Sequence, residues 1–480
     1  MCLVGVCALA ACAVSEAEPP EEQAADAAPD QVWQSFPGTN GRIAFAVLKD
    51  GGLPVVHTVN PDGTGRLPFP NPSNVAQAEP SWSPDGKKLA FASSPDTAYW
   101  EIHTAYANGS CDTQLTHNPT PGDQGGSGRN PDWSPDGAKI AFVRQCDVFT
   151  RNAKPGGAER DLTKPAGCFE FELQDFCPAW SPDGTHIAFL SARSGNWDIF
   201  IMDEDGANKV NLTNSSAYEG CPEWSPDGTR LVFNSDRDGP NLNYYVMDVS
   251  TGVVSRLTNF GASAGYLSDP AWSPNGTRIA FVSEFQNPGA NQFVLYTMRA
   301  SDGGGIKPVA RDAWPGDLDW GPRFDGEAVT WISAIRVAVT CNTLMKGLSA
   351  PTGWNAGAAS VQALAGDGWV EFTTRENTTN KIAGLSNGDT DDGYTDIDFG
   401  IDLRDDGAVL ISDGSAFHKL VGSYVAGDVF RVRVKAGVVT YWQNGVKLYR
   451  SLATPVFPLL VDTSLWTPGA TISDVVLDAN

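Results

Sequence analysis

The sequence has few basic residues and, beyond its start, no long apolar run. Its 33 Lys and Arg stand against 57 Asp and Glu, which gives a formal net charge of −24 over 480 residues. A field of that sign repels phosphate backbones and anionic lipid headgroups, so we expect neither nucleic-acid binding nor peripheral lipid binding. No later apolar run approaches the roughly 20 residues that a membrane-spanning helix needs. The sequence therefore does not predict an integral membrane protein.

The spacing typical of a zinc ribbon is also missing, since no Cys-x-x-Cys occurs. Turn-forming residues, in contrast, are abundant: there are 50 Gly and 33 Pro, together with 15 Trp. Gly and Pro favour tight turns over helices, while 41% hydrophobic residues can still build cores. The length predicts about three domains as a prior. We expect an all-β protein of many short strands.

The first twelve residues form a short apolar segment that ends in a cysteine. Leu9-Ala10-Ala11-Cys12 resembles the lipobox of bacterial lipoproteins, in which the cysteine is acylated. The resemblance implies a signal peptide over residues 1–12, lipidation of Cys12 and a place in the bacterial cell envelope, in the periplasm or on the cell surface. A hydrophobic terminus with chance cysteines is the alternative. Residues 13–35, rich in Ala, Pro and acids, predict a disordered acidic tether.

The main feature of the sequence is an internal repeat. Five copies share the pattern Pro-x-Trp-Ser-Pro-Asp/Asn-Gly and a sixth is degenerate; their tryptophans are Trp82, Trp133, Trp180, Trp224, Trp272 and Trp320. In each full copy a short strand ends at Trp, Ser-Pro-Asp/Asn-Gly supplies a tight turn, and further strands follow. Trp-to-Trp steps of 44 to 51 residues indicate propeller blades of four strands.

The two ends of the repeat region complete each other. The first unit, at residues 43–45, has no Trp strand, and the last Trp strand, at Trp320, has no strands after it. The strand numbers balance only if these two segments pair. We therefore predict a six-bladed β-propeller over residues 36–325, closed by a blade shared between its N- and C-terminal ends, because closure removes exposed sheet edges.

The repeat resembles that of TolB-type propellers, the periplasmic component of the Tol–Pal envelope system. The resemblance implies the fold more strongly than the role, because the same repeat serves many exported binding proteins and some accessory domains of peptidases and lyases. TolB itself carries an α/β domain before its propeller, whereas here the tether precedes the propeller directly. Partnership with the Tol machinery is therefore not implied.

Residues 326–480 follow another strand-rich pattern. Alternating strands around Asn444-Gly445 predict a type I′ hairpin. With segments 353–357 and 366–372, the pattern resembles the concanavalin-like (SPRY-like) sandwich modules of bacterial surface proteins. The resemblance implies an antiparallel β-sandwich, a jelly roll, that binds glycans or proteins. Tyr441 and Trp442 are candidates for an aromatic carbohydrate platform, although strand alternation leaves at most one of them accessible.

Acidic and amide residues recur just ahead of the Trp strands. Equivalent positions of successive blades lie on a ring about the propeller axis, with the first strand nearest the channel. We therefore predict an oxygen-rich channel mouth that could attract Ca²⁺ or a cationic group of a peptide or amino sugar. Solvated turn acids are the alternative. The predicted ligand-binding residues are Glu79, Asn130, Asp132, Glu223, Asp269, Asp317 and Asp319.

Two further groups are weaker metal candidates. Asp389, Asp391 and Asp392 crowd one loop that could bind Ca²⁺, although the position of the following glycine departs from the EF-hand pattern and an ordinary acidic loop is the alternative. His57 and His103 share one register in successive third strands. Pectin lyases with this propeller hold a divalent metal with histidines, but other blades carry aromatic residues at this position, which favours packing.

Six cysteines remain after the first three, and an exported location permits disulfides. Sequence alone cannot choose among the 15 pairings of six cysteines. The preferred bridges are Cys168–Cys177, which would close a short loop, and Cys111–Cys146.

No catalytic acid–base or nucleophile set is recognisable in the sequence. We therefore expect a non-enzymatic, monomeric envelope lipoprotein, attached to the membrane only through its lipid anchor. It would bind an envelope protein or a cell-wall or extracellular glycan through the channel mouth and the sandwich. The alternative is a metal-dependent polysaccharide lyase or hydrolase of the propeller type, which would use His57, His103 and the ring of acids.

Overall fold

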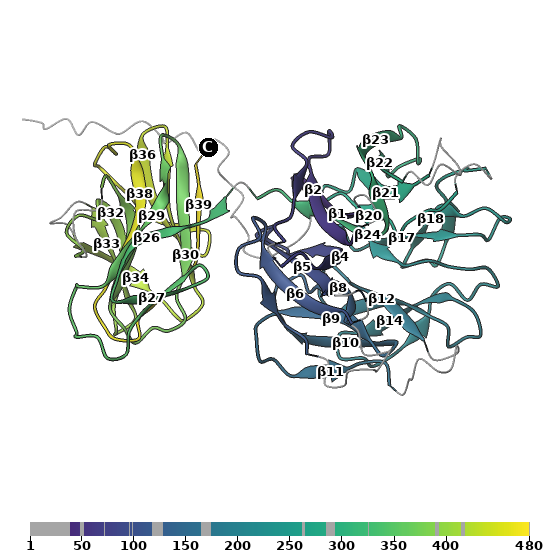
Figure 1. The fold of residues 1–480 in the computed structure, drawn as a ribbon, viewed down its shortest axis with the longest axis horizontal. Coiled ribbons are helices and arrows are strands. Elements are labelled where there is room, and N and C mark those ends of the chain that lie inside the picture. Colours follow the sequence, from purple (N-terminus) through teal and green to yellow (C-terminus); the bar gives the residue numbers. More distant parts are fainter. Residues whose placement is uncertain are drawn as a thin grey trace, which may run out of the picture.

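The computed structural model describes residues 39–48, 52–71, 73–95, 97, 99–117, 128–164, 174–261, 265–284, 293–324, 326–388, 393–413 and 418–479. Cys12, the tether, Cys168 and the acids Asp389, Asp391 and Asp392 lie outside these ranges. Every regular element in the described ranges is a β-strand, and no helix there could cross a bilayer. Figure 1 shows two all-β bodies, a propeller formed by the purple-to-teal part of the chain and a sandwich formed by the green-to-yellow part.

The propeller consists of six four-stranded antiparallel sheets. Blade one contains β24 (Ala313–Pro322), β1 (Asn40–Leu48), β2 (Pro54–Val59) and β3 (Leu67–Pro68); blade two contains β4 (Ala76–Trp82), β5 (Lys88–Ser94), β6 (Glu101–Tyr106) and β7 (Thr113–Gln114); blade three contains β8 (Arg129–Trp133), β9 (Lys139–Arg144), β10 (Asp147–Asn152) and β11 (Glu159–Asp161). Blade four contains β12 (Asp175–Trp180), β13 (His186–Ser191), β14 (Asp198–Asp203) and β15 (Val210–Asn211); blade five contains β16 (Glu223–Trp224), β17 (Arg230–Ser235), β18 (Asn243–Asp248) and β19 (Val254–Arg256); blade six contains β20 (Ala271–Trp272), β21 (Arg278–Ser283), β22 (Val294–Arg299) and β23 (Lys307–Arg311).

Blade one closes the ring as the sequence predicts. Its innermost strand, β24, comes from the C-terminal end of the propeller and pairs antiparallel with β1, with Ile43 opposite Trp320 and Phe45 opposite Leu318. These apolar residues are buried in one cluster with residues of blade six. The shared blade confirms the predicted six-bladed architecture.

The repeated tetrapeptide forms the turn between the first two strands of blades two to six. In blade two, the Ser83 hydroxyl donates a hydrogen bond of 2.6 Å to Asp85 Oδ1, and Gly86 has a φ of +68°, a conformation that favours glycine. The second strand then buries a phenylalanine completely in every blade: Phe45, Phe91, Phe142, Phe189, Phe233 and Phe281. Turn chemistry and strand alternation therefore place one apolar layer in each blade.

The second body is a sandwich of two antiparallel sheets, which confirms the fold predicted for the C-terminal region. One sheet follows the order β27 (Val337–Thr340), β28 (Thr343–Lys346), β39 (Thr471–Asp478), β30 (Gly368–Thr373), β35 (Val429–Lys435), β36 (Val438–Gln443) and β37 (Val446–Arg450), with β25 (Glu327–Ala328) also paired to β39. The other follows β26 (Trp331–Ile335), β29 (Gly357–Leu364), β38 (Leu459–Leu465), β31 (Lys381–Ser386), β32 (Phe399–Leu403), β33 (Ala408–Asp413) and β34 (His418–Ser423). Inward-facing residues of both sheets form one core, which includes Val370, Phe372, Ile401 and Phe430.

Both predicted disulfides are wrong. Cys177 is bonded to Cys221, with a Cα–Cα distance of 5.5 Å, so it cannot pair with Cys168. Cys111 is a free thiol, whereas Cys146 is disulfide-bonded. The physical reason for the first error is the ring itself: Cys177 of blade four and Cys221 ahead of blade five both precede a proline of the repeat, and the axis brings these equivalent positions together.

Candidate binding site in the propeller channel

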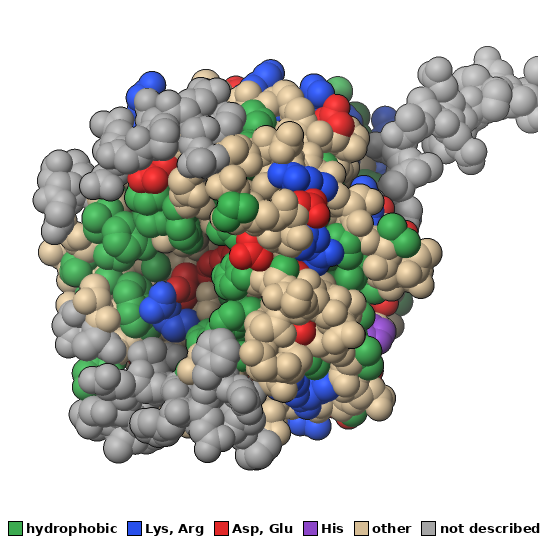
Figure 2. All heavy atoms as spheres, turned by 90° about the vertical axis from the view of Figure 1, so that its right-hand side faces the viewer, with side chains coloured by type: hydrophobic (Ala, Val, Ile, Leu, Met, Phe, Trp, Pro, Cys, Tyr) green, Lys and Arg blue, Asp and Glu red, His purple; other side chains and the backbone are tan. Residues whose placement is uncertain are grey.

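The first strands of the six blades line a cavity of about 80 Å³ on the propeller axis. Its outer layer consists of the residue before each repeat proline, or before Leu318 in the degenerate copy: Glu79, Asn130, Cys177, Cys221, Asp269 and Asp317. Its inner layer includes residues directly ahead of the tryptophans, namely Ser81, Asp132, Glu223 and Asp319. All seven residues predicted from the repeat therefore line one cavity. Figure 2 shows a hollowed face of the propeller with acidic side chains at the bottom of the hollow.

The two cysteines are the part of this ring that sequence reasoning missed. They occupy two of the six outer positions and contribute sulfur where the other blades contribute oxygen or nitrogen. The sequence does indicate this position, because each cysteine directly precedes the first proline of a repeat copy, Pro178 or Pro222, as Glu79 and Asn130 do in theirs. The disulfide joins blades four and five at the cavity wall.

Two inner acids connect neighbouring blades through the backbone. The Trp82 N–H donates a hydrogen bond of 2.6 Å to Asp319 Oδ2, and the Trp180 N–H donates one of 2.7 Å to Asp132 Oδ2. Burial raises the pKa of Asp132 to about 7 although the Trp180 N–H acts in the opposite direction. Burial likewise raises the pKa of Asp319 to about 6 against the pull of two backbone N–H groups. Both acids therefore have a structural task as well as a place in the cavity.

Glu223, the third inner acid, has no such partner. No hydrogen bond or ion pair to its carboxyl group is found within the described ranges. Burial, and then the charges of Asp132, Asp319 and Asp317, raise its pKa well above the ordinary value. Without a cation nearby, this carboxyl group favours its protonated form.

The outer acids form a proton-sharing pair and an ion pair. Asp317 and Asp269 are hydrogen-bonded through their side chains, and burial followed by the charge of Asp269 raises the pKa of Asp317 well above its ordinary value. Burial also raises the pKa of Asp269, while the hydrogen bond from Asp317 opposes that rise. Asp317 therefore holds the shared proton, since hydrogen bonding raises its pKa and lowers that of its partner. Glu79, in contrast, accepts a 2.7 Å hydrogen bond from Arg129 Nε.

The donor atoms suit a hard or an organic cation. Carboxylate and amide oxygens are the ligands that Ca²⁺ prefers, and they also bind ammonium and guanidinium groups. Among the described residues, Asp269 and the sulfurs of Cys177 and Cys221 lie within 4.8 Å of one another. Because those sulfurs are bonded to each other, they offer no thiolate, so this trio is not a zinc site.

Other predicted residues lie away from the channel. His57 lies 6.3 Å from the Phe45 ring and His103 lies 5.7 Å from the Phe91 ring, measured between ring centroids, and neither lines the cavity. Phe142 and Phe149 make the equivalent ring contact in blade three, with ring centroids 5.7 Å apart. The two histidines thus occupy aromatic packing positions. The lyase alternative requires them beside the channel acids, and neither histidine lines the channel cavity.

Of the two residues predicted as an aromatic carbohydrate platform, Tyr441 is not accessible to a ligand. Tyr441 is fully buried in the sandwich core, with its hydroxyl 3.3 Å from the Ser412 carbonyl oxygen, so a ligand cannot reach it. Trp442, its neighbour on the opposite face of β36, is partly exposed, and its Nε1 donates to Thr440 Oγ1 at 3.0 Å. Strand alternation separates the two rings.

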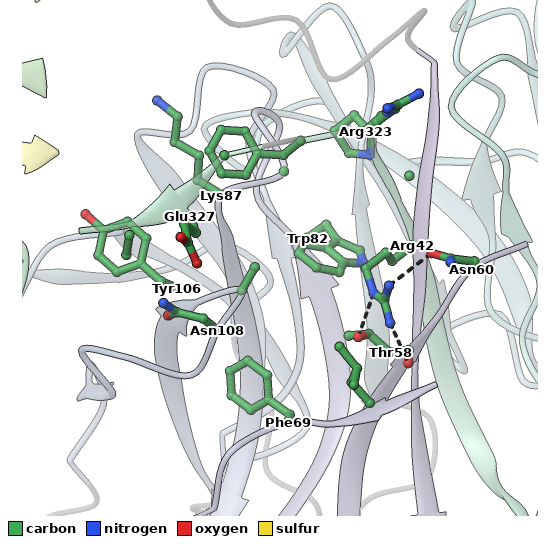
Figure 3. Close-up of a pocket in the computed structure, with 18 of the residues that line it drawn as sticks. Arg42, Thr58, Asn60, Phe69, Trp82, Lys87, Tyr106, Asn108, Arg323 and Glu327 are labelled. Atoms are coloured by element: carbon green, nitrogen blue, oxygen red, sulfur yellow. Dashed lines mark hydrogen bonds between the residues drawn. The ribbon is translucent and has the colours of Figure 1, made fainter. Parts of the chain in front are cut away.

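A second, larger hollow lies where blades one and two meet the segment that leads to the sandwich (Figure 3). Its volume is about 1040 Å³, and Phe69, Trp82 and Tyr106 give it an aromatic lining. The Arg42 guanidinium in its wall donates to Thr58 Oγ1 at 2.9 Å and to Asn60 Oδ1 at 3.0 Å, as the dashed lines in Figure 3 show. This basic group therefore holds two strands of blade one together.

Known proteins with similar folds match the propeller. Residues 130–307 match the model of the TolB beta propeller domain, and no curated protein matches the chain in sequence. TolB from Acinetobacter baumannii is 21% identical, with 59% of this chain and 67% of that chain covered and a TM-score of 0.49. A putative TolB from Agrobacterium tumefaciens is also 21% identical, with 59% and 99% covered and a TM-score of 0.44. The repeat and the sheet order show a six-bladed β-propeller, of which residues 130–307 match the TolB beta propeller domain, followed by a two-sheet β-sandwich.

Proposed function

We propose that this protein is a non-enzymatic binding protein of the bacterial cell envelope, and that the mouth of its propeller channel binds a cationic group of a partner. The observation that carries the proposal is the set of converging carboxyl groups without basic partners. Of the six cavity acids, Glu79 alone forms an ion pair within the described part of the chain. Asp132, Glu223, Asp269, Asp317 and Asp319 remain to bind a cation.

Electrostatics supports a cation as the ligand. Burial raises the pKa values of these carboxyl groups, and the charges of neighbouring carboxyl groups in the same small cavity raise them further. A bound cation would replace the protons and stabilise the ionised forms. Binding should therefore release protons and should weaken as the pH falls below the raised pKa values, of which that of Asp132 is about 7.

The size of the cavity limits the ligand. About 80 Å³ accommodates a metal ion with water, an ammonium group or a guanidinium group, but it is too small for a sugar ring with its substituents. A protein or an amino-sugar polymer would therefore insert one cationic group, while the rest of the ligand contacts the rim. The sandwich would supply a second surface, and two modest sites on one tethered chain gain from effective concentration.

Calorimetric titration tests the channel site directly. The probes are CaCl₂, butylammonium and methylguanidinium, which represent a metal ion, a lysine side chain and an arginine side chain. We expect at least one of them to bind the wild-type protein at pH 8, and Glu223→Gln to weaken that binding by at least about tenfold, since one lost charge contact contributes about 1.4 kcal/mol or more. Glu204→Gln removes an exposed acid whose ion-pair partner is Lys139, and it is the matched control. Equal affinity of both variants, or no binding by any probe, would contradict the proposal.

The envelope location is tested separately. Lipidation of Cys12 predicts that radiolabelled palmitate is incorporated into the wild-type protein in bacterial cells and not into Cys12→Ser. Label in both proteins, or in neither, would contradict the anchor without affecting the channel site.

A further inference from the structure

The propeller and the sandwich meet where blade two faces the sheet that contains β30 and β39. Lys87 Nζ lies 2.5 Å from Glu371 Oε1 of β30, and both side chains are largely buried. The Tyr106 hydroxyl donates a 2.8 Å hydrogen bond to Asp474 Oδ1 of β39. These two polar contacts hold the start of β5 and the end of β6 against the sandwich.

Two cysteines face each other beside these contacts. Cys111 lies in the turn between β6 and β7, and Cys341 lies in the turn between β27 and β28. Both are free thiols; Cys111 is half-buried and Cys341 is exposed. The Cys341 side chain hydrogen-bonds to the Cys111 side chain, and the backbone of the next residue, Asn342, also hydrogen-bonds to Cys111. Tyr106 provides a further link, since its side chain hydrogen-bonds to Asn342.

We propose that Cys111 and Cys341 form a redox modification site, at which oxidation joins the propeller and the sandwich through a disulfide bond. Each cysteine lies in a turn outside the paired strands, so the two sulfurs can reach disulfide geometry by small turn movements. The chain already holds the Cys177–Cys221 bridge, which indicates maturation where disulfides form. The same conditions would oxidise this pair.

The chemistry is thiol–disulfide exchange with a disulfide oxidant such as oxidised glutathione. The exposed Cys341 thiolate attacks one sulfur of the oxidant, which releases one thiol and leaves a mixed disulfide on Cys341. The Cys111 thiolate then attacks the Cys341 sulfur and displaces the second thiol. The protein loses two hydrogen atoms and the oxidant gains them, so atoms and electrons balance.

The second step should be slow at neutral pH. Burial, followed by the contact with Cys341, raises the pKa of the Cys111 thiol to about 12. Because the thiolate is the nucleophile, its small population limits the rate, and the reaction should accelerate as the pH is raised. Once formed, the bond would fix the orientation of the two domains.

Peptide mapping of the full-length protein tests the proposal. The protein is incubated with oxidised and reduced glutathione at several ratios, the remaining thiols are alkylated, and the protein is digested without reductant. We expect a cross-linked peptide pair containing Cys111 and Cys341, with one bond per molecule and no dependence on protein concentration. Its rate of formation should rise between pH 7 and pH 9.

Cys341→Ser is the matched control, in which Cys111 should be recovered as the alkylated thiol or as its glutathione adduct. Three results would overturn the proposal: full alkylation of both cysteines under oxidising conditions that leave Cys177–Cys221 intact, a glutathione adduct on Cys341 that never resolves, or a bond between two molecules that appears only at high protein concentration. None of these results bears on cation binding in the channel, which Cys111 and Cys341 do not line.

Discussion

The backbone N–H of Trp82 donates a hydrogen bond to the carboxyl group of Asp319, which lies 237 residues further along the chain. This bond joins blade two to the last strand of the propeller, and Asp319 Oδ1 also accepts the N–H of Trp320 at 2.6 Å. Asp132 makes the equivalent bond from blade three to blade four. The channel acids are thus part of what holds the ring of blades together.

The first prediction concerns this bond. Asp319→Ala leaves the buried N–H groups of Trp82 and Trp320 without their acceptor, and each unsatisfied donor costs about 1–3 kcal/mol. Asp319→Asn retains an acceptor oxygen and should cost less. Urea unfolding at pH 8 measures both variants against the wild-type protein. An Ala variant as stable as the Asn variant would show that the bond does not support the ring.

The second prediction concerns pH. Because the pKa of Glu223 in the folded protein is raised, the folded state binds more protons than the unfolded state above the ordinary pKa of Glu, and stability falls as the pH rises. Glu223→Gln removes the ionisable group and with it this loss of stability at high pH. Without added cation, we expect Glu223→Gln to have a higher urea midpoint than the wild-type protein at pH 8 and the same midpoint near pH 4. A constant difference at both pH values would contradict the raised pKa.

The third prediction compares two adjacent lysines at the domain interface. Lys87 forms the buried ion pair with Glu371, and removing one partner of such a pair costs about 3 kcal/mol. Lys88 lies 3.8 Å from Asp474 in a more exposed pair, which contributes at most about 1 kcal/mol. Lys87→Ala should therefore destabilise the protein more than Lys88→Ala in urea unfolding at pH 7.

The pH dependence of that difference is a further check. Burial alone would raise the pKa of Glu371, but Lys87 and Arg431 outweigh it and hold the pKa below its ordinary value. The contribution of this ion pair to stability is therefore fully present above the ordinary pKa of Glu. It is lost as the pH falls through the lowered pKa of Glu371. The difference between the lysine variants should shrink in acid. Equal losses of stability in Lys87→Ala and Lys88→Ala at pH 7 would contradict the stabilising role of the buried ion pair between Lys87 and Glu371.

The fourth prediction concerns the bridge between blades four and five. Cys221→Ser removes the Cys177–Cys221 disulfide and should cost about 2–4 kcal/mol, since the bridge restricts the unfolded chain and fixes neighbouring first strands. Thermal unfolding with and without reductant measures the effect. Reductant should lower the midpoint of the wild-type protein by more than that of Cys221→Ser, which retains the bridge at Cys146. An equal shift in both proteins would assign the effect to another bridge, such as the one at Cys146.

The sequence predicted the ring because the fold is repeated. One turn motif at a constant period specifies equivalent positions, and closure follows from the incomplete units around Ile43 and Trp320. The convergence of Glu79 and Asp317 in one cavity follows from the same symmetry.

Pairings outside the repeat could not be predicted in this way. Lys87 and Glu371 are 284 residues apart and belong to different folds, so no local pattern connects them. A short loop favours Cys168 as the partner of Cys177, whereas the ring places Cys177 beside Cys221. The repeat also does not reveal that Asp319 binds backbone N–H groups whereas Glu223 has no such partner, because that difference depends on how each first strand lies against the next blade.

The central claim is that the channel carboxyl groups exchange protons for a cation. The most direct test is the number of protons released when a binding probe, CaCl₂, butylammonium or methylguanidinium, is titrated into the wild-type protein at pH 6.5 in two buffers of different ionisation enthalpy. The raised pKa values of Asp132 and Glu223 predict release of about one proton or more per cation, and less from Glu223→Gln. Binding without proton release, or equal release from both proteins, would contradict the account.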